Sequence, residues 1–179
     1  MNGQTLREGI FALRTRRFGT VAELMIKRLV KLGKGKNQFH DLYDDSDHKR
    51  IEVKFSTVMK GAEGTVTEDT VLQCIEEAIA ANRMVSFQDW KNFKFDCNIQ
   101  QVKRVEFDVL YYGLFFADCI KIFRILSEQI GSQISYSDKQ HKGNVGEGQF
   151  HINGDTFQTH LNDYLYQTLT YEELYELLK

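Results

Sequence analysis

The sequence predicts an α/β (α+β) protein in which helices flank a mixed central sheet. Three segments support this fold class. Residues 19–32 carry apolar side chains at helical spacing, residues 39–56 have the pattern of an antiparallel hairpin, and residues 107–116 form an almost unbroken apolar and aromatic run. Because such a run is typical of a strand covered on both faces, we expect residues 107–116 to lie at the centre of the sheet.

The size and composition of the chain favour one soluble domain over residues 1–179. The hydrophobic fraction of 42% and the charged fraction of 27% are ordinary for a soluble protein. The run at 107–116 is too short to span a bilayer. Cys74, Cys97 and Cys119 lack the close spacing of a zinc site or a disulfide framework. We therefore expect a cytoplasmic protein without a membrane partner.

The charge is nearly balanced overall but unevenly distributed. A net charge of -2 and a pI near 6.2 exclude a protein that coats nucleic acid indiscriminately, because such proteins need a large positive field. Between Arg14 and Lys36, however, eight Lys or Arg residues stand against a single acid, Glu23. This basic segment is a candidate surface for contacts with phosphates.

The N-terminal half of the chain contains two predicted helices around the hairpin. The first has its apolar stripe within residues 19–32 and is expected to end at Gly33. The second carries an apolar stripe at residues 71–79, and Thr65 or Thr67 can cap it.

The C-terminal half is predicted to complete the sheet. Residues 120–125 would return beside the central strand, and residues 135–148 form a polar, glycine-rich segment. A short strand is expected at 149–153. Thr170 can cap a last helix that ends at Leu178. The resulting order is helix, hairpin, helix, strands, helix.

The hairpin brings three polar groups together. Successive side chains of a strand point to opposite faces, so Glu52 and Lys54 share one face while the alternate apolar residues share the other. Asp41 lies on the preceding strand. Hydrolysis of a phosphodiester needs a hard cation, and carboxylates are the usual protein ligands of magnesium. Asp41 and Glu52 can supply them, and Lys54 can orient the attacking water or stabilise charge on the phosphorane.

A simpler interpretation is that Glu52 and Lys54 form the solvated face of an amphipathic strand. The order of the neighbouring segments favours a catalytic site instead, because an acid lies on the preceding strand, a helix comes before the hairpin and a buried strand follows it. The first carboxylate is itself a choice between Asp41 and Asp44. We prefer Asp41 because both it and Glu52 would then lie mid-strand, with Leu42 in the core.

In this order the chain resembles the PD-(D/E)xK nucleases and, among them, the small type II restriction endonucleases. The resemblance runs from the helix with Glu23 through Asp41 and Glu52–Lys54 to the strand at 107–116 and its hairpin partner. The proline of the family name is absent, and His40 takes its place.

The resemblance implies a single nuclease domain with a restriction-endonuclease-like mixed central sheet flanked by helices. Its core would cover residues 19–126, and residues 132–179 would hold the DNA-recognition segment and the C-terminal helix. The metal would be Mg²⁺, with the backbone carbonyl of Val53 joining Asp41 and Glu52 as a ligand. The products would carry 5′ phosphates.

Glu23 has two interpretations of equal weight. Nucleases of this type often bring an extra acid from the first helix towards the metal, which would make Glu23 a further catalytic residue. Alternatively, Glu23 forms an ordinary exposed ion pair with Lys27 at i, i+4.

Recognition of a DNA sequence needs donors and acceptors that reach base edges. One segment concentrates such side chains beside glycines that let the backbone approach a groove. The alternative is a solvated loop followed by an amphipathic strand. The candidate DNA-binding residues are Lys139, Gln140, His141, Lys142, Asn144, Gln149 and His151.

These features together predict a Mg²⁺-dependent type II restriction endonuclease acting at a specific site in double-stranded DNA. A two-fold site favours a homodimer, and a cognate DNA methyltransferase would belong to the same system without necessarily touching this chain. The alternatives are a repair, recombination or nicking nuclease of low sequence specificity and a non-catalytic DNA-binding protein of the same fold.

Overall fold

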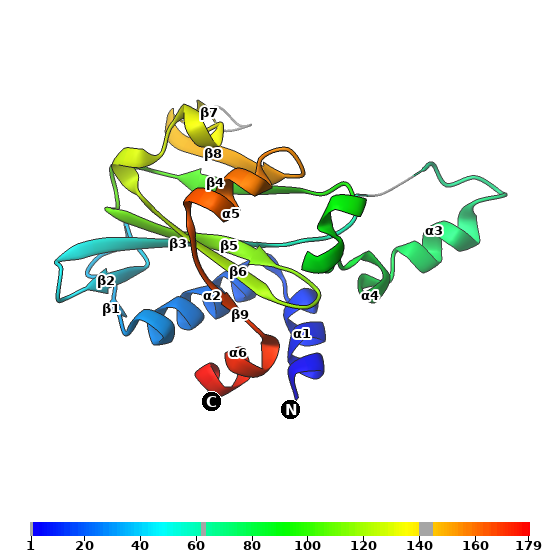
Figure 1. The fold of residues 1–179 in the computed structure, drawn as a ribbon, viewed down its shortest axis with the longest axis horizontal. Coiled ribbons are helices and arrows are strands. Elements are labelled where there is room, and N and C mark those ends of the chain that lie inside the picture. The colour runs from blue at the N-terminus through cyan, green and yellow to red at the C-terminus, as the bar shows by residue number, and fades with distance from the viewer. Residues whose placement is uncertain (1, 62–63, 140–144) are drawn as a thin grey trace.

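The computed structural model describes residues 2–61, 64–139 and 145–179, which form helices and two sheets (Figure 1). The α-helices are α1 (Gly3–Ala12), α2 (Thr15–Val30), α3 (Val71–Glu77), α4 (Ala80–Arg83), α5 (Phe157–Asp163) and α6 (Tyr171–Leu178). The 3-10 helices are η1 (Phe87–Asn92), η2 (Ser127–Gln129) and η3 (Ser132–Ile134). The strands are β1 (Gly33–Lys34), β2 (Leu42–Asp44), β3 (Lys49–Thr57), β4 (Asp96–Val102), β5 (Val109–Phe115), β6 (Ile120–Leu126), β7 (Ser137–Lys139), β8 (Val145–Asn153) and β9 (Leu165–Leu169).

The larger sheet is mixed, as predicted. Within the described residues its strands follow the order β1-β2-β3-β5-β6-β9, with β3 parallel to β5 and the other neighbours antiparallel. The expected hairpin is confirmed, because Leu42 of β2 pairs with Ile51 of β3. The expected return strand is also confirmed, since β6 runs antiparallel to β5.

Strand β5 is buried on both faces, which confirms the interpretation of the apolar run. Val109, Tyr111 and Phe115 pack with α1, α2 and α6 on one face of the sheet. Leu110, Tyr112 and Leu114 pack into the second core, which also contains residues of the smaller sheet and of α5. In Figure 1 these two groups of elements lie on opposite sides of the larger sheet.

The smaller sheet corrects the expectation for residues 135–148. Instead of one long polar loop, the described part of this stretch contains β7 and the first residues of β8, and the smaller sheet has the order β4-β8-β7. Phe150 and Ile152 of β8 and Cys97 and Ile99 of β4 bury one face of this sheet. Pairing between strands so far apart in sequence leaves no local signal, so the single-sheet expectation was incomplete.

The predicted bounds of α2 and the predicted cap of α3 were also wrong. Helix α2 begins four residues earlier, at Thr15, and ends at Val30. It is closed by Lys31, whose φ of 60° lets its N–H reach the carbonyl of Lys27, rather than by Gly33, which starts β1.

Helix α3 starts at Val71 behind Thr70, so neither Thr65 nor Thr67 is its N-cap. Its apolar stripe is exposed instead of buried, with Leu72 78% accessible, because α3 and α4 form an arm beside the body of the molecule (Figure 1). The cap of α6 is confirmed: Thr170 accepts from the N–H of Glu173, whose side chain accepts from the N–H of Thr170. No helix in the described ranges has the length and apolarity needed to cross a membrane.

Candidate active site

The β2–β3 hairpin holds Asp41 at the point where the ladder between the two strands ends. The N–H of Asp41 donates to the carbonyl of Ile51 at 3.1 Å. Its carboxylate Oδ2 accepts the N–H of Val53 at 2.9 Å. The carboxylate thus gives the N–H of Val53 a hydrogen-bond acceptor, because β2 is too short to pair with this residue. The sequence analysis expected Asp41 to lie mid-strand, but Asp41 precedes β2. The expectation that Leu42 lies in the core beside Val53 is confirmed.

Gly35 allows this local arrangement. Its N–H donates to the carbonyl of Asp41 at 3.0 Å, and a Cβ at this position would collide with the carbonyl of His40. Only glycine permits this approach. His40 is itself buried, and its Nε2 accepts the N–H of Lys36 at 3.2 Å. The ring thus supports the loop that presents Asp41, and burial lowers the pKa of His40.

Glu52 and Lys54 lie together on one face of β3, as the alternation predicts. Only 9% of Glu52 is accessible, and its Oε1 is ion-paired with Lys54 Nζ. Burial raises the pKa of Glu52 to about 7, against the opposing effect of the Lys54 ammonium, and the negative charge of Asp41 raises it further. Glu52 is therefore not part of the solvated face of an ordinary strand, because its side chain is buried.

Glu23 reaches this group from α2, which packs beneath β3. Burial raises the pKa of Glu23, and the negative charge of Asp41 adds to this effect while Lys54 opposes it. Within the part of the chain that the structure describes, Glu23 makes no ion pair with Lys27. The arrangement thus favours an association of Glu23 with Asp41 and Lys54.

The carbonyl of Val53 lies on the same strand edge as the carboxylate of Asp41. The N–H and C=O of one strand residue point to the same side, and the N–H of Val53 points to Asp41. Beyond Ile51, none of the described strands pairs with this edge of β3. At the position that the sequence assigns to a metal, this edge of β3 therefore has no further strand among the described residues.

The donors at this edge fit a hard cation. Asp41 Oδ1 and Glu52 Oε2 take no hydrogen bond from any residue that the structure describes. No group of three or more His, Cys, Asp or Glu within the described ranges has the arrangement of a metal centre. Magnesium needs fewer protein ligands than that, because it keeps several of its waters and binds through one or two carboxylates. Two carboxylates and one carbonyl are thus a sufficient set.

Asp44, the alternative first carboxylate, has a different role in the hairpin. Its Oδ1 accepts from the N–H and the hydroxyl of Ser46, at 2.9 and 2.6 Å, and from the N–H of Asp47 at 3.2 Å. These bonds shape the turn, and the hydroxyl of Ser46 is the main cause of the lowered pKa of Asp44. The geometry favours Asp41 over Asp44.

The candidate DNA-binding residues fall partly on the smaller sheet. Gln140, His141, Lys142 and Asn144 lie outside the described residues, and Lys139 is exposed on β7. Gln149 and His151 project from the outer face of β8. This confirms the strand expected at 149–153, although β8 begins earlier, at Val145.

Sequence reasoning missed the partners of these two residues on β4. Asn98 Nδ2 donates to Gln149 Oε1 at 3.0 Å, and His151 Nδ1 lies 2.8 Å from Asp96. We call these four residues the recognition face. The alternation of Asp96 and Asn98 with buried apolar neighbours was the signal that could have identified them.

A second charged cluster links the smaller sheet to the candidate site. Lys103 Nζ lies 3.3 Å from Glu147 on β8 and 3.7 Å from Glu106. Glu147 is the main cause of the raised pKa of Lys103. The charge of Glu106 also contributes to the raised pKa of Glu52. Lys103 thus joins β8 to Glu106, whose charge acts on Glu52.

Comparison with protein-family models, with curated proteins and with solved structures finds no match to this chain. The function of the site is therefore argued from its own geometry and chemistry.

Proposed function

We propose that this protein is a Mg²⁺-dependent endonuclease of the PD-(D/E)xK type that hydrolyses phosphodiester bonds in double-stranded DNA. One observation carries the proposal. Glu52 is a buried carboxylate with a raised pKa, paired with Lys54 and adjacent to Asp41, at an open strand edge. Perturbed carboxylates with a specific cationic partner are typical of functional sites, whereas a structural surface pair gains nothing from burial.

The topology supports the same proposal at the level of the fold. An antiparallel pair, β2 and β3, is followed by β5, which is parallel to β3 and buried on both faces. Helix α2 precedes the hairpin and packs against it. This order supports the restriction-endonuclease-like core that we propose from the sequence motifs.

Each residue of the site then has a role. Asp41, Glu52 and the carbonyl of Val53 would hold Mg²⁺, which, when bound, neutralises negative charge that develops on the phosphate. Lys54 orients the attacking water and donates to an oxygen of the phosphorane. Glu23 would add a carboxylate near Asp41 that can accept a proton from the attacking water. Cleavage would leave 5′ phosphates.

Within this class we favour a type II restriction endonuclease over a repair, recombination or nicking nuclease. The recognition face supports sequence specificity, because Asn and Gln can form paired hydrogen bonds with adenine, and His and Asp add further donors and acceptors. A homodimer would supply the two centres that a double-strand cut requires. A cognate DNA methyltransferase in the same cytoplasm would protect the host sites.

The decisive experiment is digestion of a long, fully sequenced DNA with Mg²⁺ or with a chelator. Wild type is compared with Asp41→Ala and Lys54→Ala, and Asp44→Ala is the matched control because that carboxylate belongs to the turn. The proposal is supported if wild type and Asp44→Ala produce discrete Mg²⁺-dependent fragments while Asp41→Ala and Lys54→Ala produce none. A smear or nicks would retain the chemistry and indicate the low-specificity nuclease. Binding without cleavage, unchanged by Asp41→Ala, would reject the catalytic role and leave a DNA-binding protein.

A further inference from the structure

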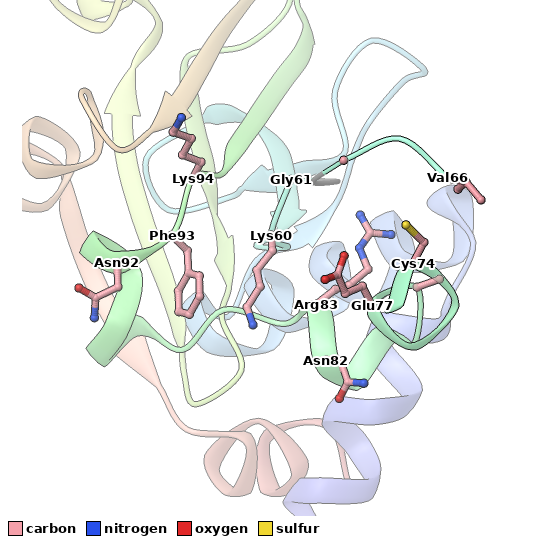
Figure 2. A pocket seen from close by; sticks show the side chains of 12 residues that line it. Lys60, Gly61, Val66, Cys74, Glu77, Asn82, Arg83, Asn92, Phe93 and Lys94 are labelled. Atoms are coloured by element: carbon pink, nitrogen blue, oxygen red, sulfur yellow. The ribbon is translucent and has the colours of Figure 1, made fainter. Parts of the chain in front are cut away.

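A hollow of about 530 Å³ lies where the chain after β3 meets the α3–α4 arm and the segment leading into β4 (Figure 2). Backbone hydrogen bonds fix its walls. The N–H of Lys60 donates to the carbonyl of Arg83 at 2.8 Å, and the N–H of Gly61 donates to the carbonyl of Lys94 at 3.2 Å. Three segments distant in sequence are thus held together, and their side chains surround one place, which we call the arm hollow.

The lining of the arm hollow is predominantly positive. Lys60, Arg83 and Lys94 contribute three cations, against one carboxylate from Glu77. None of the three cations is ion-paired with a residue that the structure describes. Lys60 runs towards the ring of Phe93, with its Nζ 4.4 Å from the ring centroid (Figure 2). Among the described residues the lining thus carries more positive than negative charge, which favours an anionic ligand.

A second hollow, of about 840 Å³, adjoins the first and shares Asn92, Phe93 and Lys94 with it. It extends to Asp96, the partner of His151 on the recognition face. The two hollows therefore share residues 92–94 as one wall. The second hollow contains Asp96 and Asp155 beside its lysines, so the excess of positive charge belongs to the arm hollow and matches a phosphate-bearing ligand.

We infer that the arm hollow binds backbone phosphates of the DNA at a distance from the scissile bond. This inference rests on the proposed function. Lys60 follows Lys54 by six residues along β3 and its extension, which corresponds to about 20 Å at the rise of an extended chain. At about 3.4 Å per nucleotide along one strand, the bound phosphate falls roughly six nucleotides from the cut.

The test is the salt dependence of DNA binding, measured by fluorescence anisotropy in chelator with a labelled duplex of about 30 base pairs. In Lys60→Gln/Arg83→Gln the slope of log Kd against log salt should fall by about 0.9 for each phosphate that the variant no longer neutralises. When the salt is raised from about 50 to 200 mM, the Kd of wild type should therefore rise more than the Kd of the variant, by a factor of about 3.5 for each such phosphate. Lys179→Gln, at an exposed terminus, is the matched control and should keep the wild-type slope.

Two further measurements keep the outcome specific. Lys60→Arg/Arg83→Lys retains both charges and should keep the wild-type slope, whereas a reduced slope in this variant would indicate damage to the fold and overturn the inference. Competition by inorganic phosphate or a mononucleotide at concentrations near the Kd for DNA would also overturn it, because the ligand would then be a small anion.

The failure of this inference can be distinguished from failure of the proposed function. Normal cleavage with an unchanged slope in Lys60→Gln/Arg83→Gln would reject the role of the arm hollow alone. A reduced slope in a protein that never cleaves DNA would reject the nuclease and support the DNA-binding role of the arm hollow.

Discussion

His160 offers a quantitative test of how the core tolerates a titratable group. It is fully buried among Phe123, Phe150 and Tyr164, its Nδ1 lies 2.9 Å from the hydroxyl of Tyr112, and its Nε2 has no partner among the described residues. Burial lowers the pKa of His160 from 6.5 to about 4. The unfolded chain therefore binds the proton more tightly than the folded chain does.

The sign of the pH dependence follows from linkage. Below the unfolded pKa of 6.5 the unfolded state gains a proton that the native state refuses, so stability falls as the pH falls towards 4. The whole lowering of the pKa from 6.5 to about 4 corresponds to about 3 kcal/mol, and the part lost between about pH 7 and pH 4.5 is about 2 kcal/mol.

The perturbation is the double substitution Tyr112→Phe/His160→Leu, which removes both polar partners together and should be nearly neutral near pH 8. Urea unfolding of wild type and variant across this pH range gives the difference in their free energies of unfolding. That difference should change by about 2 kcal/mol in favour of the variant as the pH falls. Tyr112→Phe alone should keep the acid sensitivity of wild type while losing about 1–3 kcal/mol at every pH. An unchanged acid loss in the double variant would refute the assignment to His160.

Three further predictions concern the site and the sheet that supports it. Glu52→Gln should abolish cleavage yet stabilise the protein in chelator by about 3 kcal/mol near pH 8. The pKa of Glu52 is about 7 in the folded state against 4.5 in the unfolded state, so ionisation of Glu52 lowers the free energy of unfolding as the pH rises through this window. Thermal unfolding at several pH values checks this, and a destabilised variant would contradict it. Asp41→Asn should abolish cleavage of plasmid DNA, whereas Asp44→Asn, which keeps the turn acceptor, should cleave as wild type does; equal losses would remove the distinction between them. Gly113→Ala should cost roughly 1–3 kcal/mol in urea unfolding, because its Cβ would collide with the carbonyl of Lys121 and the ring of Phe55, and an unchanged midpoint would show that the sheet can relax there.

The parts of the fold that sequence could predict are those with a local signal. The apolar run became β5, and the alternation of residues 50–56 correctly placed Glu52 and Lys54 on one face of β3. Thr170 was correctly predicted to cap α6, and the structure adds Glu173 as its reciprocal partner. In each case neighbouring residues supply both the pattern and its cause.

The parts that failed depend on contacts distant in sequence. The pairing of β4 with β8 joins Cys97 to Ile152, which no periodicity within either segment encodes. The stripe of α3 has helical spacing, but spacing cannot show whether another element covers it, and Ile75 remains 60% exposed. Likewise the burial that raises the pKa of Glu52 comes from the folded surroundings of β3, which the sequence of the strand does not contain.

The unequal lengths of β2 and β3 explain why the site lies where it does. Strand β3 has nine residues and β2 has three, so most of one edge of β3 has no strand beside it. An unpaired edge exposes backbone groups and is normally a liability. Here the carboxylate of Asp41 accepts the N–H of Val53, and the carbonyl of Val53 lies on the same edge, where none of the described strands pairs with β3. The end of the ladder thus brings the Asp41 carboxylate, the Val53 carbonyl and the buried Glu52 to one edge of β3, which a longer β2 would cover. Extending β2 by substitution should therefore stabilise the hairpin while closing the site.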